Sequence, residues 1–507
     1  MAQRLSKRHR RKHDRIADWQ QKDAGYFDRL GIPRDELSRI ELAFAGKIVL
    51  PGDADYDQDR QESNPAFQAY PLIIFYCETD NDVWIALTVC RIYNLWVCVR
   101  AGGHSTAGYS VNSGAVIDVS GLSYVRVDQV NQTVSVGAGT SFDILNSALN
   151  NTGLHVPSGE CGDVCVGGFV QGGGYGYTSR CFGVQSDSAL AFRVMLANGG
   201  TVTANATMNS DLYWAIRGGT GGNFGVLLEV TYRLYPVASV WAYSIQWDIS
   251  NAAAALFELQ AHYMLTGAPK QLGATINLGF NGSTPVLLMQ GMYVGSASDG
   301  KQALQSLLAI PSADLNVDIS GPYGSMNTYL ETHPYIIPNP PDGSKEAKRA
   351  GYIEKPLTLS DWDEIVAYAQ TAPNPNNTAI IEPYGGAINV FPIADSAFIH
   401  RTAAMDFFVD VFWVNDNDEA LAKLWLEGFW ILMRPHLNGH VYQNYPYAEL
   451  ADFQNAYWGQ AYPRLMQVKT KYDPTNFFHF AQSIGLTTPD PDATPIIYDL
   501  SPPQLMI

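Results

Sequence analysis

The stretch Val156–Gly176, VPSGECGDVCVGGFVQGGGYG, constrains this chain most, because it holds eight glycines in twenty-one residues and only two charged residues. Without a Cβ atom, glycine lets the backbone approach a flat or anionic group closely. Val, Cys, Phe and Tyr interleave with the glycines and favour burial, so the stretch is not a linker. A second stretch of this kind, Arg100–Ser110 (RAGGHSTAGYS), lies upstream. The two loops predict a site for a large cofactor, with His104 and Cys161 as its reactive side chains.

The length and composition describe a globular enzyme with more than one domain. A chain of 507 residues is too long for one ordinary core and indicates two or three domains. Its hydrophobic content of 46% and aromatic content of 12% are typical of a well-buried protein. The net charge of −17 argues against a nucleic-acid partner, because phosphate affinity depends on lysine and arginine. No apolar run reaches ~18 residues, so we expect no membrane span.

The N-terminus departs from this acidic average. Seven basic residues lie between Arg4 and Arg15, against the single acid Asp14. Two interpretations stay open, a targeting or polyanion-binding tail and a solvated, frayed basic terminus, and we favour the second. No apolar segment of the kind that a secretory signal peptide requires follows these charges. We therefore expect a cytoplasmic protein, with secretion as the alternative.

The six cysteines are too few and too scattered for a disulfide scaffold. Cys161 and Cys165 have the spacing of half a metal site. No matching Cys or His pair follows them, so we predict no metal.

The first half of the chain has an α/β pattern. Leu72–Tyr76 is a predicted strand, Asp80–Tyr93 a helix with Thr79 or Asp80 as its N-cap, and Trp96–Arg100 a second strand. This second strand leads directly into the 100–110 loop, an order that presents backbone N–H groups to a phosphate. Further strands are expected at 115–119, 124–128, 133–136, 189–196, 201–204 and 225–235, and helices at 28–45, 142–150 and 211–217.

From about residue 240 onward the sequence predicts a second, α+β domain. Strands are expected at 244–248, 286–293 and 403–413, helices at 252–265, 301–308, 359–368 and 418–433, and a proline-rich loop at 334–345. Residues 456–471 form an amphipathic helix interrupted by Pro463. In the 403–413 strand, Asp406, Phe408 and Asp410 share one face because side chains alternate along a strand. These carboxylates either line a polar site or lie on an exposed sheet surface, and both interpretations stay open.

Four motifs together resemble the FAD-linked oxidases of the vanillyl-alcohol-oxidase superfamily, in particular the berberine-bridge-enzyme-like branch. They are RAGGHSTAGYS at 100–110, GECGDVCVGG with GGGYG at 159–176, DLYWAIRG with GNFG at 211–225, and YWG, YDPTNF and QSI at 457–484. One glycine loop alone is weak evidence, whereas four motifs in the family's order are specific. The resemblance covers roughly residues 65–240 and 440–485, with a looser match between them.

The resemblance implies an α+β fold. A two-part FAD-binding domain of the vanillyl-alcohol-oxidase type would be joined by an α+β substrate domain whose antiparallel sheet lies over the flavin. The expected segments are a basic arm at 1–45, the FAD-binding domain at 46–240, the substrate domain at 241–440 and a segment at 441–507 that completes the FAD domain.

The resemblance also implies FAD held by two covalent bonds, from His104 to the 8α-methyl group and from Cys161 to the 6-position of the ring. Histidine nitrogen and thiolate are nucleophiles that can add to an electrophilic flavin. The flavin would supply the redox chemistry and the protein its position and tuning. The other cofactor contacts implied by the motifs are Arg100, Ala101, Gly102, Gly103, Ser105, Gly108, Val164, Gly167, Gly168, Gly172, Gly173, Gly174, Tyr175, Gly225 and Val226. The 100–110 loop is expected to make most of the phosphate contacts.

Four positions refine this resemblance. Phe169 stands where many relatives carry histidine, and Ala461 where an asparagine commonly reaches the flavin. Cys165 stands where glycine is usual, and we assign it no role. Val164 matches the smaller residue associated with oxygen-reactive members, which favours an oxidase over a dehydrogenase.

The stretch Tyr442–Tyr445 (YQNY) resembles one in which a tyrosine deprotonates the substrate hydroxyl, which makes Tyr445 the candidate base. A phenol titrates near ~10, so Tyr445 needs assistance near neutral pH. Asp406, which follows His400–Arg401, is the candidate acidic partner. Plain aromatic packing is the alternative role for Tyr445.

The predicted reaction is a hydride transfer from an alcohol carbon of a sugar or a multi-ring natural product to FAD, with O2 reduced to H2O2. The alternatives are a flavin dehydrogenase that uses another acceptor and a non-catalytic flavin-binding protein. We expect a monomer or a small homo-oligomer.

Overall fold

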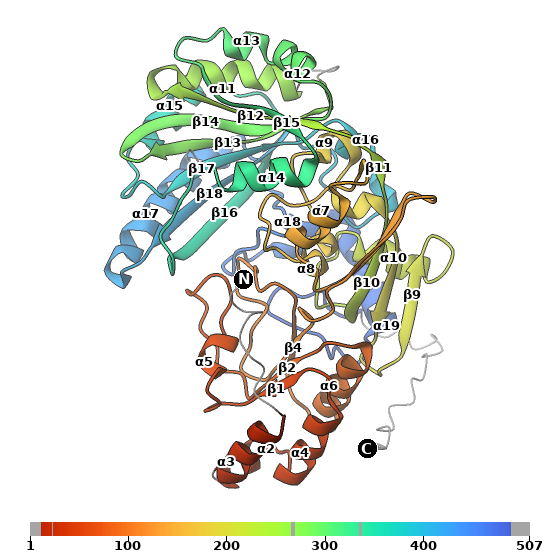
Figure 1. The fold of residues 1–507 in the computed structure, drawn as a ribbon. Coiled ribbons are helices and arrows are strands. Elements are labelled where there is room, and N and C mark those ends of the chain that lie inside the picture. The colour runs from red at the N-terminus through yellow and green to blue at the C-terminus, as the bar shows by residue number, and fades with distance from the viewer. Residues whose placement is uncertain (1–11, 23, 265–268, 334–336, 488–507) are drawn as a thin grey trace.

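Three sheets of four or more strands organise the computed structural model, which describes residues 12–22, 24–264, 269–333 and 337–487. Two of the sheets build the half of the molecule that carries the glycine loops, and the third forms a separate layer above them (Figure 1). The chain therefore has the predicted α+β architecture.

The first sheet carries the 100–110 loop at the end of a strand. Its strands, in spatial order, are β1 (Lys47–Val49), β2 (Ile73–Tyr76), β4 (Ala115–Asp118) and β3 (Val97–Arg100). β2, β4 and β3 are parallel, and α6 (Asp80–Ile92) connects β2 to β3. Thr79 caps α6, since its side chain accepts a hydrogen bond from the Asp82 backbone N–H, as the sequence predicts.

The second sheet is antiparallel and lies beside the 156–176 loop. Its spatial order is β5 (Val125–Asp128), β6 (Thr133–Gly137), β10 (Val226–Arg233), β8 (Ala189–Met195) and β9 (Thr201–Asn205). Short helices accompany it: α7 (Phe142–Leu149), α8 (Val166–Gln171), α9 (Ser179–Phe182) and α10 (Ser210–Ile216). A two-stranded pair, β7 (Leu154–His155) with β11 (Tyr235–Pro236), follows the edge of this half.

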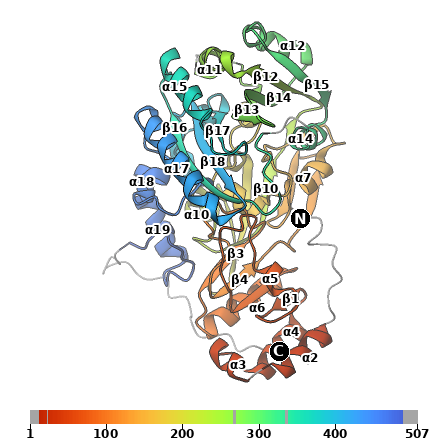
Figure 2. The ribbon, with the colours of Figure 1, turned by 90° about the vertical axis from the view of Figure 1, so that its left-hand side faces the viewer.

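The third sheet has seven antiparallel strands. Its spatial order is β15 (Asp314–Gly321), β12 (Val240–Asp248), β14 (Thr284–Tyr293), β13 (Leu272–Asn281), β17 (Thr378–Pro383), β18 (Met405–Trp413) and β16 (Lys345–Ile353). One face packs against α11 (Ile249–Met264), α15 (Leu359–Ala369) and α17 (Asp416–Met433) in an aromatic-rich apolar core. The other face is turned toward the glycine loops (Figures 1 and 2).

Strand register decides which residues reach which face. Ile276 pairs with Ile381 and both lie in the apolar core beneath the helices. Their neighbours Asn277 and Ile380 also pair, and they point to the opposite face.

The N-terminal segment is more ordered than the sequence predicts. From Lys12 onward it forms α2 (Lys12–Gln21), α3 (Ala24–Leu30) and α4 (Arg34–Ala43). Trp19 is fully buried in the same core as Phe75 of the first sheet, and the buried Arg15 guanidinium pairs with Glu41. The prediction of a solvated, frayed terminus is therefore wrong for this part, while residues 1–11 lie outside the described residues. The single helix expected at 28–45 is divided because Pro33 begins a new helix.

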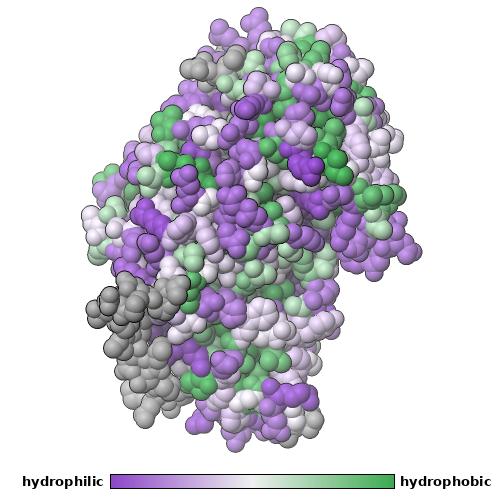
Figure 3. Space-filling view, turned by 180° about the vertical axis from the view of Figure 1, so that it is seen from behind, coloured by the Kyte–Doolittle hydropathy of each residue, from purple (hydrophilic) through white to green (hydrophobic). Residues whose placement is uncertain are grey.

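The C-terminal segment returns to the first half of the molecule. α18 (Phe453–Trp458) and α19 (Tyr462–Tyr472) stand where the sequence predicts one interrupted helix, and Pro463 lies in the first turn of α19. α19 packs against α10, about 250 residues earlier in the chain. Seen from behind, hydrophilic residues cover much of the surface and hydrophobic ones appear in separate groups (Figure 3). None of the described helices is both long enough and apolar enough to cross a membrane.

The remaining described helices are shorter or lie in connections. They are α5 (Tyr56–Asp59), α12 (Ala297–Ala303), α13 (Gln305–Leu308), α14 (Tyr323–Glu331) and α16 (Ala387–Val390).

Candidate active site

A cavity of about 740 Å³ lies between the inner face of the seven-stranded sheet and the two glycine loops. Its volume is in the range of small-molecule and cofactor sites. Its wall includes segments that are far apart in sequence: the loops at 101–106 and 159–169, the turn at 220–222, the inner sheet face and the C-terminal residues 478–480.

Most of the predicted site residues line this cavity. They are Ala101, Gly102, Gly103, His104, Ser105, Cys161, Val164, Gly167, Gly168, Tyr175, Gly225 and Tyr445. Seven others do not form part of its wall: Arg100, Gly108, Gly172, Gly173, Gly174, Val226 and Asp406.

Arg100 is turned away from the cavity and holds the loop from behind. Its Nε donates to Asp118 Oδ2 at 2.5 Å, and its Nη2 donates to the Asp59 carbonyl at 2.8 Å. The side chain is buried, so the guanidinium is committed to these partners. The resemblance implied that Arg100 contacts the cofactor, whereas the structure gives its side chain a role in positioning the loop.

Gly172, Gly173 and Gly174 shape the backbone behind the cavity wall. A Cβ on Gly172 would lie 1.9 Å from Asn444 Oδ1, and one on Gly173 would lie 2.7 Å from the Phe398 ring. Gly174 has φ +90°, and its N–H donates to the Tyr442 hydroxyl at 2.9 Å. These glycines therefore let the 156–176 loop pack against the 442–445 stretch, rather than forming the cavity surface themselves.

His104 and Cys161 reach the same cavity from the two loops. His104 Nε2 lies 3.3 Å from Asp163 Oδ2, and its side chain is 27% exposed. Cys161 is exposed and unpaired, whereas Cys165 is buried. Although part of the residue is exposed to the cavity, desolvation of the thiol by the cavity wall, together with the carboxylates of Glu331 and Glu160, raises the pKa of Cys161 to about 12.

The cavity wall fits a flat cofactor. A Cβ on Gly102 would lie 3.1 Å from His104 Cδ2 and 3.2 Å from the Cys165 backbone nitrogen, so only glycine lets the loop fold this closely. A Cβ on Gly168 would meet nothing within 4 Å, which shows open space above this residue. A glycine-walled space lined by His104 and Cys161 suits a flat ring.

Two departures from the family motif also line the cavity. Phe169 packs against Phe142, with ring centroids 4.7 Å apart. The Cys165 thiol donates to the Gly139 carbonyl at 3.4 Å. Both side chains thus have packing or hydrogen-bonding partners in the protein, as well as a surface in the cavity.

The inner sheet face supplies a polar roof to the cavity. Asn277 pairs with Ile380, which pairs with Phe408 on the next strand, so the three side chains lie in one row. One row along, Lys348 pairs with Asp410. Sequence analysis placed Phe408 and Asp410 on one face; of the two interpretations left open, the polar site is the one that holds here.

Tyr445 has an acidic partner, which is Glu382. The Tyr445 hydroxyl donates to Glu382 Oε1 at 2.8 Å, and Glu382 is 3% exposed on β17. Burial, with Glu382 as the strongest charged neighbour, holds the pKa of Tyr445 well above its usual value. The same ring packs against Phe408 at 4.7 Å. Tyr445 is therefore both packed and hydrogen-bonded in the cavity wall.

The choice of Asp406 as this partner is wrong. Asp406 pairs across the strands with Glu382 but lies outside the cavity wall, and neither of its carboxylate oxygens has a hydrogen-bond partner among the described residues. Burial keeps its pKa well above the usual value. Sequence analysis missed Glu382 because β17 is short, ends in proline and carries no motif.

Lys348 brings a positive charge to the roof. Its Nζ lies 2.8 Å from Asp410 Oδ2 and 3.5 Å from Glu346 Oε1. It also lies 4.6 Å from the centroid of the Tyr445 ring. Burial opposes this charge, but the carboxylates of Asp410 and Glu346 outweigh it and raise the pKa of the ammonium group.

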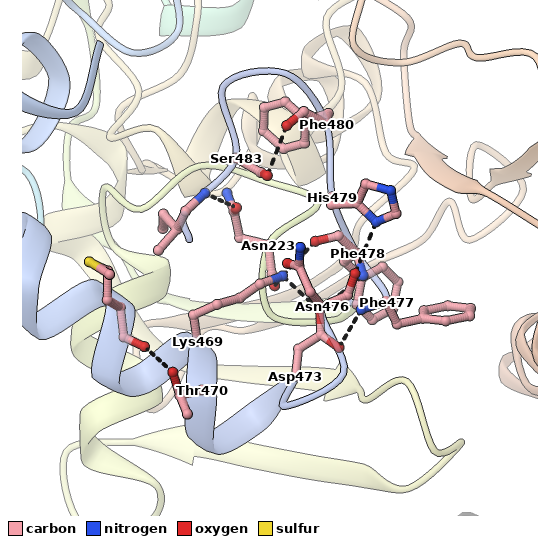
Figure 4. Close-up of polar contacts among 12 residues, drawn as sticks. Asn223, Lys469, Thr470, Asp473, Asn476, Phe477, Phe478, His479, Phe480 and Ser483 are labelled. Carbon is pink, nitrogen blue, oxygen red and sulfur yellow. Dashed lines mark hydrogen bonds and ion pairs between the residues drawn. The ribbon is translucent and has the colours of Figure 1, made fainter. Parts of the chain in front are cut away.

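A buried lysine attaches the C-terminal segment to the cavity wall. Lys469 Nζ lies 2.6 Å from both Asp473 Oδ2 and the Asn223 carbonyl, and it also donates to the Phe478 carbonyl (Figure 4). Asn223 in turn donates through its side chain to the Gly219 carbonyl at 3.0 Å. This network fixes the 220–222 turn and the 478–480 segment, both of which line the cavity.

No group of three or more histidine, cysteine or acidic residues is arranged to hold a metal ion within the described ranges.

Known proteins show the same domain content and fold. A family described as FAD binding domain matches residues 71–205, and one described as berberine and berberine-like matches residues 441–485. An uncharacterised FAD-linked oxidoreductase of Bacillus subtilis is 29% identical over 452 residues, covering 87% of this chain and 96% of that protein. Berberine bridge enzyme-like 12 of Arabidopsis thaliana is 26% identical, covering 84% of this chain and 87% of that protein.

Solved structures agree with these relatives. Wild-type BBE-like 1 of Physcomitrella patens superposes with a TM-score of 0.81 at 27% identity, over 89% of this chain and 99% of that one. A chitooligosaccharide oxidase superposes with a TM-score of 0.78 at 22% identity, also over 89% of this chain and 99% of that one, which shows the fold alone.

A cofactor cavity between glycine loops and an antiparallel sheet, with an FAD-binding domain match on the loop side, defines an FAD-linked oxidoreductase. Within this class, the match at 441–485 and the superposed structure from Physcomitrella are more specific. The chain therefore resembles the berberine-bridge-enzyme-like FAD-linked oxidoreductases in both sequence and fold.

Proposed function

We propose that the protein oxidises an alcohol, with Tyr445 and Glu382 accepting the hydroxyl proton and O2 as the final electron acceptor. The hydrogen bond from Tyr445 to Glu382 in the wall of the cofactor cavity carries this proposal. Its substrate class is an alcohol carbon of a sugar or a multi-ring natural product.

The proton follows the hydrogen bond that the structure contains. The substrate hydroxyl gives its proton to the Tyr445 oxygen, while the phenolic proton of Tyr445 passes to Glu382 Oε1. The carbon that carries this hydroxyl group loses a hydride. The alcohol thus becomes a carbonyl, with the loss of two electrons and two hydrogens. When bound, FAD would supply the acceptor for that hydride, and O2 would take up the two electrons and become H2O2.

The chain assists this transfer electrostatically. Burial raises the pKa of Glu382 well above its ordinary value, so it binds a proton readily. The Lys348 ammonium group near the Tyr445 ring favours negative charge on the phenol oxygen. Tyr445 thus acts with a proton acceptor on one side and a cation over its ring.

We also propose that two bonds hold the cofactor, from His104 and from Cys161. The two side chains reach one cavity from different loops, which supports attachment to a single ring. Formation of each bond would remove one hydrogen from the flavin and one from the protein side chain. Each bond therefore releases two protons and two electrons, and O2 would take up the electrons. Val164 in the cavity wall supports oxygen as the acceptor by family resemblance.

Acid precipitation tests the covalent attachment. Flavin that stays with the denatured chain supports the proposal, and His104→Ala and Cys161→Ser variants would show which bond is present. If all of the flavin washes out of the wild-type precipitate, covalent attachment is disproved.

Replacement of Tyr445 by Phe tests the proton acceptor. We expect the rate of flavin reduction to fall by about 100- to 10,000-fold, the usual contribution of general base catalysis, with flavin content unchanged. Glu382→Gln should lower the same rate. An unchanged rate in both variants would rule out this pair. Slow reoxidation of the reduced wild type in air would instead indicate a dehydrogenase.

A further inference from the structure

The wall of the cavity is rich in acidic side chains. Glu346, Glu382 and Asp410 lie on the sheet that forms the roof, and Glu160, Glu331 and Asp342 lie on the loops and the helix around it. Among the described residues of the cavity wall, Lys348 is the only lysine or arginine, and Asp410 and Glu346 already surround it. The cavity wall thus carries more acidic than basic side chains, and a cationic ligand would favour the ionised form of these carboxyl groups.

Several hydrogen-bond acceptors on this roof lack a donor. Glu382 Oε2, Asp410 Oδ1 and Asn277 Oδ1 are buried and have no hydrogen-bond partner among the described residues. The residues that carry them are 3%, 5% and 1% exposed, and all three line the cavity. A buried acceptor without a donor is costly, so a bound ligand that donates hydrogen bonds would remove this cost.

Glu160 and Glu382 come close together at one point of the roof. Thr275 donates to Glu160 Oε1 at 2.5 Å. Thr275 precedes Asn277 by two residues on β13, which places it beside Glu382 where the pairing of β13 and β17 ends. The Tyr175 hydroxyl spans this end, since it donates to the Pro383 carbonyl at 2.9 Å and the Ala274 carbonyl at 3.3 Å.

The titration of the two acids agrees with this proximity. After burial, Glu160 is the charge that most strongly raises the pKa of Glu382. Burial raises the pKa of Glu160 itself to about 7. Two carboxylates in this arrangement repel each other when both are ionised, and a cation between them would relieve that repulsion.

We propose that the substrate is an amino alcohol, whose ammonium group binds between Glu160 and Glu382 while its hydroxyl reaches Tyr445. This proposal rests on the proposed function, because it assigns Tyr445 the reacting hydroxyl. Tyr445 occupies Glu382 Oε1, and the ammonium group would occupy Glu382 Oε2 on the same carboxylate. Since Tyr445 and the ammonium group would share one carboxylate, the amine and the hydroxyl should lie close together in the substrate.

The cavity wall favours an organic cation over a neutral polyol or a metal ion as the ligand. A neutral polyol would satisfy the free acceptors but leave the excess charge in place. A metal ion needs converging ligands, which the described residues do not supply. An ammonium group donates several hydrogen bonds and carries the missing charge.

Matched pairs of ligands test the proposal on the holoenzyme. We would compare glucosamine with glucose, and phenylethanolamine with phenylethylene glycol, in which a hydroxyl replaces the amine. Binding is read from the change in the absorbance spectrum of the oxidised flavin without oxygen, and turnover from flavin reduction. We expect each amine to bind at least about ten-fold more tightly than its neutral partner, a difference typical of a partly desolvated charge pair.

The Glu160→Gln variant separates charge from shape. It should remove most of the preference for the amine and leave binding of the neutral partner nearly unchanged. Glu364→Gln, which changes an exposed carboxylate on α15, is the matched control and should keep the preference. Preference for the amine that survives in Glu160→Gln would overturn the assignment of this site.

The two readouts distinguish failure of this proposal from failure of the proposed function. If the amines bind but no alcohol reduces the flavin, the binding site stands and the proposed oxidation fails. If neutral alcohols reduce the flavin and the amines neither bind nor react, the oxidation stands and the amino alcohol proposal is overturned. A spectrum that no amine changes overturns it in every case.

Discussion

At the scale of the residue, the buried carboxyl groups of the cavity wall have raised pKa values. Burial raises the pKa of Asp410 to about 7 although the Lys348 ammonium group lies against it. Glu382 and Glu160 shift in the same direction for the same first reason. Such a carboxyl group is a stronger proton acceptor in its ionised form, and a bound cation would favour that form.

Ionisation of the buried Glu160 carboxyl group should destabilise the folded protein. The Glu160→Gln variant should reveal this as a difference in the free energy of unfolding that depends on pH. The pKa of Glu160 rises from 4.5 to about 7 on folding, so the folded state binds its proton more tightly than the unfolded state. Ionisation then costs stability in the wild type as pH rises from about 4.5 to 7, and the variant has no such cost. In urea unfolding, the free energy of unfolding of Glu160→Gln should gain steadily on that of the wild type across this interval and then level off.

The comparison of variant with wild type cancels the other titrating groups, such as the buried His155, whose burial lowers its pKa to about 3. Glu364→Gln should give a nearly flat difference because its carboxylate is exposed. A difference between wild type and Glu160→Gln that stays constant from pH 4.5 to 7 would contradict the raised pKa.

At the scale of the element, the C-terminal helix α19 depends on one buried charge. Lys469 and Asp473 have side chains with 0% exposure. Lys469→Met would leave the Asp473 carboxylate buried without its cation, and breaking a buried pair in this way typically costs about 3–5 kcal/mol. We expect a lower thermal midpoint and easier proteolysis of the C-terminal segment.

Lys471 on the same helix provides the control. It pairs with Asp211 at 2.7 Å, but the two side chains are 42% and 34% exposed. Lys471→Met should therefore cost about 0–1 kcal/mol, as surface pairs do. Equal losses in the two variants would show that the buried network does not carry the attachment of the helix.

Elements with strong local signals could be predicted from the sequence, and elements defined by pairing could not. The helix behind Thr79 and the strands before and after it follow from a cap and from apolar runs. The sequence of β16, KEAKRAGYI, is rich in charged residues and carries no clear strand pattern. Its Lys348 is accommodated in the sheet because it pairs with Asp410 on β18. β13 contains two glycines and two asparagines and is stabilised by its neighbours on both sides.

The same limit applies to the site. His104, Cys161 and Tyr445 belong to motifs and could be placed in one cavity from the sequence. Glu382 depends on the register of β17 against β18, which also explains why its direct neighbour Asp406 was the wrong choice. Arg100 belongs to a motif, yet its side chain points to Asp118, because an arginine beside a buried aspartate pairs with it.

At the scale of the whole molecule, the cavity exists only while its two halves stay together. Side chains of the loop half bond directly to the strands of the seven-stranded sheet. The Tyr177 hydroxyl accepts from Gln290 Nε2 at 2.9 Å, and Tyr175 donates to the Pro383 carbonyl. The contacts are buried, so separation of the halves would expose unpaired polar groups as well as apolar surface.

Arg180 is the strongest single test of this coupling. It lies on α9, is 2% exposed, and donates to backbone carbonyl groups of the other half: Nε donates to Leu272 at 2.9 Å and Nη1 donates to Tyr384. Arg180→Met would remove these donors and leave buried carbonyl groups unpaired, at about 1–3 kcal/mol for each. We expect a thermal midpoint lower by several degrees and a single unfolding transition that broadens or divides, because the sheet layer would then separate from the loop half before either unfolds.

Two further variants serve as controls. Arg180→Lys should recover part of the loss, since an ammonium group can still donate to one or two of these carbonyls. Arg233→Met, at an exposed position of the loop half, should leave the midpoint unchanged. If Arg180→Met unfolds at the same temperature as the wild type, the halves are held together by apolar contact alone, and the geometry of Tyr445 against Glu382 would not depend on this arginine.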